Sequence, residues 1–123
     1  MNFVKLVYNG RDYVYSDASN IEMNTLGDFL AHDIDNRMKA FRDWALNKNE
    51  HAVGGDLTLL DKKGNTIILT DMYSEEDVPT ELKMTVQQFV QLLDDWRDMV
   101  CSTKPREVII KYENNQFIIE TKN

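Results

Sequence analysis

The apolar residues of this chain gather in short runs separated by polar turn residues, and three pairs of such runs predict β-hairpins. The runs are rich in Val, Ile, Leu, Thr and Tyr, which favour extended structure. They cover residues 3–8 and 11–15, residues 56–60 and 66–70, and residues 106–112 and 116–121. The first pair flanks Asn9-Gly10, which favours a tight two-residue turn.

Between the hairpins, apolar residues recur with the 3.6-residue period of an amphipathic helix. The first predicted helix covers residues 25–47, and its apolar face consists of Leu26, Leu30, Ile34, Met38, Phe41, Trp44 and Ala45. Arg37 lies in the same sector, and we expect it to pair with Asp33 rather than to act as a functional cation.

The second helix begins with a capping box, in which the Thr85 hydroxyl and the Gln88 side chain each bond the other residue's backbone. It ends near Lys104-Pro105. Its predicted buried face consists of Val86, Phe89, Leu93, Trp96 and Val100.

The order of elements is therefore ββ-α-ββ-α-ββ. Short hairpins imply antiparallel pairing, and helices with one apolar face pack on one side of a sheet. We expect a single two-layer α+β domain over residues 1–123, with two main helices and an antiparallel sheet of about six strands. The order of the strands, and whether all six join one sheet, stay open.

The net charge of the chain limits the classes of partner that it can bind. Its 123 residues hold 14 Lys and Arg against 21 Asp and Glu, a net charge of -7. Such a chain repels nucleic acid and anionic membranes and favours a basic protein partner. No apolar run approaches the roughly 20 residues that span a bilayer. The first residues lack the features of a secretory signal, so we expect a cytoplasmic protein.

Residues for catalysis or cofactor binding are sparse. The chain has one cysteine and two histidines, His32 and His51, and no phosphate-binding loop or nucleophile elbow. We therefore expect no catalytic residues, no metal and no cofactor, although residues brought together by folding stay possible. Cys101 follows an apolar helical stripe, where a small buried side chain is the simplest interpretation.

The excess negative charge is concentrated in one part of the chain, since six of the seven net charges fall within residues 71–103. Asp94 and Asp98 are four residues apart on the predicted helix, a repulsive spacing in a half of the helix that disfavours acids. These departures from helix preference indicate either an acidic binding face or a merely solvated one. The loop before the helix is either a second part of that face or a hydrophilic turn with Tyr73 folded onto the core. The candidate partner-binding residues are Asp71, Tyr73, Glu75, Glu76, Asp77, Asp94, Asp95 and Asp98.

Residues 84–96, 104–110 and 116–120 together resemble small bacterial immunity proteins, which are encoded with contact-dependent growth inhibition systems and other polymorphic toxins. The resemblance implies a cytoplasmic inhibitor that binds one cognate toxin domain, often a basic RNase or DNase, and has no catalytic residues. Two alternatives stay open: a non-catalytic interaction module with a different partner, and a small enzyme or ligand-binding domain. The oligomeric state is not predicted.

Overall fold

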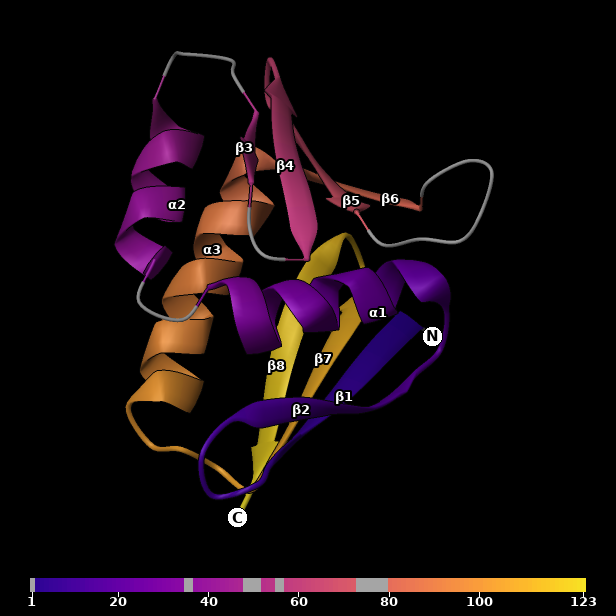
Figure 1. Cartoon of the computed structure of the whole chain (residues 1–123), viewed down its shortest axis with the longest axis vertical. Coiled ribbons are helices and arrows are strands. Elements are labelled where there is room, and N and C mark those ends of the chain that lie inside the picture. The colour runs from indigo at the N-terminus through magenta and orange to yellow at the C-terminus, as the bar shows by residue number, and fades with distance from the viewer. Residues whose placement is uncertain (1, 35–36, 48–51, 55–56, 73–79) are drawn as a thin grey trace.

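The computed structural model describes residues 2–34, 37–47, 52–54, 57–72 and 80–123, and within them the chain forms two four-stranded antiparallel sheets and three α-helices (Figure 1). The strands are β1 (Asn2–Tyr8), β2 (Tyr13–Ala18), β3 (Val53–Gly54), β4 (Thr58–Lys63), β5 (Thr66–Asp71), β6 (Glu81–Thr85), β7 (Glu107–Glu113) and β8 (Gln116–Lys122). The helices are α1 (Ile21–Asp28), α2 (Met38–Leu46) and α3 (Val86–Trp96), with π-helical turns η1 (Phe29–Asp33) and η3 (Arg97–Cys101) following α1 and α3. The predicted α+β class is confirmed.

The strands divide between two sheets. The terminal sheet has the order β2-β1-β7-β8 and joins the two ends of the chain, whereas the central sheet has the order β3-β4-β5-β6. Helices α1 and α3 each contact strands of both sheets, and α2 packs on α3. The three predicted hairpins are present as β1–β2, β4–β5 and β7–β8. Strands β3 and β6, which carry weak sequence signals, were not predicted.

The first predicted helix is not continuous, so the prediction of one helix over residues 25–47 is wrong. The chain instead forms α1 and η1, which end by Asp33, and begins α2 at Met38. The break lets α1 lie against the terminal sheet while α2 packs on α3, which one straight helix could not do. The expected pairing of Arg37 with Asp33 is also wrong, because the Arg37 Nη2 atom donates to the Gly54 carbonyl over 2.8 Å.

The start of α3 matches its sequence signal. Thr85 Oγ1 accepts from the Gln88 backbone N–H and the Gln88 side chain accepts from the Thr85 N–H, which completes the capping box. Gln88 also donates through Nε2 to the Asn115 carbonyl over 2.7 Å, which ties α3 to the β7–β8 turn.

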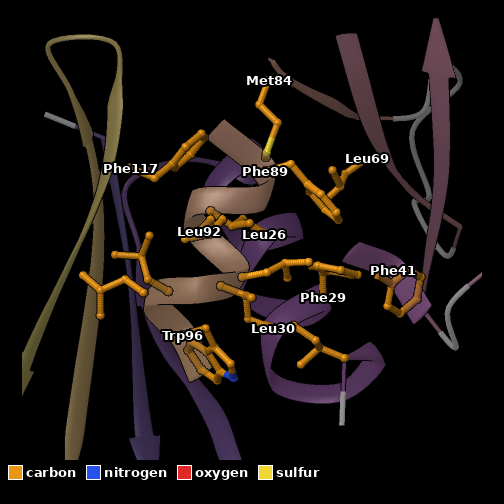
Figure 2. Packing of buried hydrophobic residues seen from close by; sticks show 14 of the residues in the cluster. Leu26, Phe29, Leu30, Phe41, Leu69, Met84, Phe89, Leu92, Trp96 and Phe117 are labelled. Carbon is orange, nitrogen blue, oxygen red and sulfur yellow. The ribbon is translucent and has the colours of Figure 1, made fainter. Parts of the chain in front are cut away.

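The core lies between the helices and the inner faces of both sheets (Figure 2). Phe29 lies at its centre, with ring centroids 5.2 Å from Phe41 and 5.9 Å from Phe89. The predicted helix faces are buried except for Met38 and Val86, which are partly buried. Cys101 is exposed rather than buried, so that expectation is wrong. Cys101 is the last residue of the π-helical turn η3, and this turn departs from the 3.6-residue period that the prediction assumed.

The β1–β2 connection also differs from its prediction. It is a four-residue loop, in which Asn9 Oδ1 accepts from the N–H groups of Arg11 and Asp12 and replaces the expected two-residue turn. The β7–β8 hairpin has a two-residue connection instead, because Asn114 and Asn115 both adopt positive φ, 53° and 61°.

Candidate functional site

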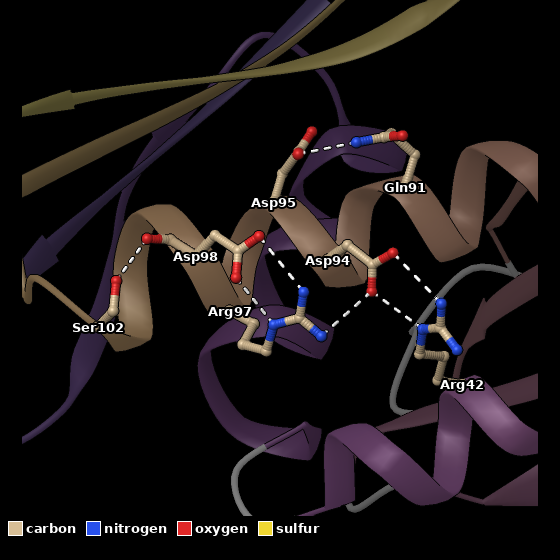
Figure 3. A network of polar contacts seen from close by, with 7 residues as sticks. All are labelled: Arg42, Gln91, Asp94, Asp95, Arg97, Asp98 and Ser102. Atoms are coloured by element: carbon tan, nitrogen blue, oxygen red, sulfur yellow. Dashed lines mark hydrogen bonds and ion pairs between the residues drawn. The ribbon is translucent and has the colours of Figure 1, made fainter.

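Of the three candidate aspartates on α3 and η3, Asp94 and Asp98 are engaged in ion pairs (Figure 3). Asp94 Oδ1 and Oδ2 accept from Arg42 Nε and Nη2, at 2.9 and 3.4 Å, and Arg42 belongs to α2. Arg97 Nη1 lies 3.6 Å from the same Asp94 Oδ1. The Asp94 carboxylate therefore faces two guanidinium groups and joins α2 to α3.

Arg97 also compensates the charge of Asp98, the second member of the repulsive pair Asp94 and Asp98. Its Nε and Nη2 donate to the Asp98 carboxylate at 2.8 and 3.3 Å, so one guanidinium lies between the two carboxylates. This hydrogen bonding lowers the pKa of Asp98. Asp95 is partly buried and accepts from Gln91 Nε2 over 2.8 Å. The ion-pair network of Arg42, Asp94, Arg97 and Asp98 thus compensates the charges of Asp94 and Asp98 without a partner.

The surplus negative charge lies elsewhere in the chain. The described residues hold thirteen Lys and Arg and fifteen Asp and Glu, so they account for two of the seven net charges. The other five belong to the stretches 35–36, 48–51, 55–56 and 73–79, which lie outside the described residues. Four of the candidate residues, Tyr73, Glu75, Glu76 and Asp77, are among them.

The described residues that flank three of these stretches are hydrogen bonded to one another. The Leu57 N–H donates to Asp33 Oδ1 over 2.9 Å, and the Leu57 carbonyl accepts from the Met72 N–H over 3.0 Å. Arg37, next to the first stretch, bonds Gly54, next to the second. Described residues next to the stretches 35–36, 55–56 and 73–79 therefore meet at one corner of the molecule. In the sequence these three stretches contain five acids and no Lys or Arg.

Three described aspartates belong to this corner, and we call Asp28, Asp33 and Asp71 the acidic corner. Burial raises the pKa of Asp28, the charges of Asp71 and Asp33 raise it further, and the nearby His32 opposes the shift. Asp28 and Asp33 end the consecutive elements α1 and η1, and the fold brings Asp71, at the end of β5, next to them from a distant part of the sequence. Among the candidates that the structure describes, Asp71 belongs to this corner; Asp28 and Asp33 were not predicted as site residues, because their approach to Asp71 depends on the fold.

Asp33 is the most unusual member of the acidic corner. Its side chain is 1% exposed, and the structure gives its Oδ2 atom no hydrogen-bond partner among the described residues. The buried hydroxyl of Thr58, next to Leu57, also has none there. Met72, which follows Asp71, is 44% exposed and adds an apolar side chain to the same corner.

In the part of the chain that the structure describes, no three His, Cys, Asp or Glu side chains are arranged to hold a metal ion. None of the described helices has both the length and the apolar composition that crossing a membrane requires. Comparisons of the chain with protein-family models, with curated proteins and with solved structures find no match. The chemistry available at the acidic corner is the binding of cationic groups by carboxylates.

Proposed function

We propose that this protein is an immunity protein, which binds and neutralises a basic toxin domain in the cytoplasm through the acidic corner and the adjoining residues of the 71–77 segment. The sequence resemblance supplies the class of partner. The observation that supports the proposal best is that Asp28, Asp33 and Asp71 lie close together, where the pKa of Asp28 is raised. Residues that flank the acidic stretches of the chain meet at the same corner.

The electrostatics favour this corner over α3. The charges of Asp71 and Asp33 raise the pKa of Asp28, and a Lys or Arg that approaches Asp28 and Asp71 relieves that repulsion. The Asp94 and Asp98 carboxylates already face guanidinium groups, so a partner would have to compete with Arg42 and Arg97 for them. The proposed surface is therefore the acidic corner rather than α3, and Asp71 is the described candidate residue that belongs to it.

The proposed mechanism is occlusion. An RNase or DNase holds substrate phosphates with Lys and Arg side chains, and carboxylates of an inhibitor can occupy the same groups. Exposed acids would mainly speed association, whereas a pair that loses its water on binding would slow dissociation. Exposed Met72 would act as an apolar anchor beside these charges.

The test is co-expression with the toxin domain encoded by the adjacent upstream gene, followed by measurements of growth and of Kd with purified proteins. Wild-type protein should suppress the toxicity. The triple variant Glu75→Gln, Glu76→Gln, Asp77→Asn and the single variant Asp71→Asn should each raise Kd at least about tenfold, or about 1.4 kcal/mol. Asp98→Asn, an exposed change in η3, is the matched control and should leave Kd unchanged.

The two parts of the proposal fail separately. If the wild-type protein leaves growth inhibition intact and does not bind the toxin domain, the proposed function is wrong. If it protects the cell but only Asp98→Asn raises Kd, the function stands and the acidic corner is the wrong surface. Circular dichroism of each variant establishes that a loss of binding is not a loss of fold.

A further inference from the structure

The four edge strands of the two sheets differ in how they are protected from pairing with another chain. Strand β2 carries an irregularity in its ladder opposite Lys5 and Leu6, and β3 has two residues. A bulge and a very short strand both block edge pairing. Strand β6 also presents a short edge for pairing, because it has five residues and its Thr85 N–H already donates to Gln88.

Strand β8 has none of these protections in the described residues. Its seven residues pair with β7 in unbroken register from Glu113↔Gln116 to Glu107↔Lys122, and the strand has no proline. Residues that flank a two-residue turn form a hydrogen-bonded pair, and bonded and non-bonded pairs then alternate along the ladder. The backbone groups of Phe117, Ile119 and Thr121 therefore point away from β7, toward the open edge. A regular edge of this length is a template for another strand.

We propose that β8 pairs in antiparallel fashion with β8 of a second copy of this chain, around a two-fold axis at Ile119. In this register Ile119 meets Ile119 of the second copy, and Phe117 meets Thr121. The same three residues whose backbone groups are open in one copy thus meet the open groups of the other. The two terminal sheets become one sheet with the order β2-β1-β7-β8-β8-β7-β1-β2.

The side chains fit this register. On the outer face Ile118 lies opposite Glu120 of the second copy, and Gln116 lies opposite Lys122, so no like charges stand directly across the contact. Glu120 is held by Lys111 of its own chain, with Oε1 2.8 Å from Nζ. On the inner face a hollow of about 240 Å³ opens beside Phe117, between α3 and the start of β8. Thr121 of the second copy would enter it.

The occupant is a second copy rather than a basic partner because the edge itself is charge-balanced. It exposes one acid, Glu120, and one base, Lys122. In the proposed register both lie opposite uncharged residues of β8 in the second copy. Each copy carries a net charge of -7, however, so the remaining surfaces repel. Added salt screens that repulsion, and the dimer should therefore tighten as ionic strength rises.

Sedimentation equilibrium of the whole protein over a range of concentrations, at low and high salt, tests the proposal. Wild type should show a monomer–dimer equilibrium. Ile118→Glu places a carboxylate opposite Glu120 of the second copy and should weaken dimerisation at least tenfold. Ile118→Lys, at the same partly exposed position, places an ammonium there and should retain the dimer.

A proline pair gives a second, independent test. Thr121→Pro removes an N–H that points to the open edge of β8, so the β7–β8 ladder is kept and the dimer should be lost. Lys83→Pro on β6 is the matched control. The Asp71 N–H donates to the Thr80 carbonyl and the Val86 N–H donates to the Asn65 carbonyl. These two bonds fix the alternation along β6, so the Lys83 N–H points away from β5, toward the open edge of the central sheet. This control should leave the dimer intact.

A protein that stays monomeric at every concentration and salt overturns the proposal. So does a dimer that Ile118→Glu and Thr121→Pro leave unchanged, since its interface would then lie elsewhere. Circular dichroism identifies any variant that is unfolded, and the Ile118 pair then decides without the prolines. None of these outcomes depends on the toxin, so the dimer and the proposed immunity function are tested separately.

Discussion

Arg42 on α2 and Asp94 on α3, 52 residues apart in the sequence, form a two-point ion pair with distances of 2.9 and 3.4 Å. Their side chains are 37% and 27% exposed, so water screens the pair less than it screens a fully exposed one. Because α2 follows a break in the first helical region, this pair is one of the contacts that fix its position against α3.

The first prediction concerns the strength of this pair. A double-mutant cycle with Arg42→Ala and Asp94→Ala, measured by urea unfolding, should give a coupling free energy of about 1 kcal/mol that falls with added salt. The exposed Lys39–Asp43 pair, with side chains 88% and 58% exposed, is the control and should give about 0.3–0.5 kcal/mol. Equal couplings for the two pairs would contradict the role assigned to Arg42.

The second prediction concerns Lys62, which is 3% exposed. Its ammonium group donates to the carbonyls of Trp44 and Ala45, in the last turn of α2, and to the carbonyl of the C-cap residue Asn47. Lys62→Met should lower the free energy of unfolding by about 2–3 kcal/mol, because it removes the hydrogen bonds that a buried charged donor makes to the end of α2. The adjacent exposed Lys63→Met should change it by less than about 0.5 kcal/mol. Urea unfolding of both variants compares them directly.

The third prediction concerns Gly27, where α1 lies closest to β1. A Cβ atom added there would stand 2.7 Å from Val4 Cγ2, and Val4 is fully buried. Gly27→Ala should therefore cost about 1–3 kcal/mol of stability, despite the better helix propensity of alanine. Gly54→Ala, which meets nothing within 4 Å, is the control. If thermal melting shows Gly27→Ala to be as stable as the control, α1 can shift away from β1 at little cost.

Features encoded by neighbouring residues were predictable from the sequence, whereas features encoded by distant ones were not. The Thr85–Gln88 capping box is present as predicted, because its groups are three residues apart. The break before α2 depends on α1 and α2 packing against different partners, which no local pattern reveals. Lys62 lies between the predicted strands 56–60 and 66–70, but the structure places it in β4, and its partners are carbonyls at the end of α2, fifteen to eighteen residues earlier.

The candidate site shows the same division. The distribution of charge along the sequence identified Asp94 as a candidate, but its ion pair with Arg42 joins it to another helix, which no local pattern reveals. The acidic corner depends on three turns of chain meeting at Leu57, which only the topology reveals. Asp71 was selected for its place in an acidic run, and the fold gives it Asp28 as a neighbour.

The last prediction concerns Asp28, whose negative charge should lower the stability of the fold but favour binding of a basic partner. Its raised pKa means that the native carboxyl holds its proton more tightly than the unfolded one does. Stability is therefore lost as pH rises through the raised value, and the full cost is present at neutral pH. Asp28→Asn removes this ionisation and should raise the melting temperature at pH 7. The gain should vanish below about pH 3.9, the usual pKa of an unfolded Asp.

The same substitution should weaken binding of a basic partner, because it removes one charge from the acidic corner. Thermal melting between pH 3 and pH 7 gives the first effect, and Kd for the toxin domain gives the second. Glu81→Gln, an exposed change on β6, is the control and should alter the melting temperature little at either pH. A lower melting temperature of Asp28→Asn at pH 7 would mean that the carboxylate stabilises the fold. The repulsion on which the acidic corner depends would then be absent.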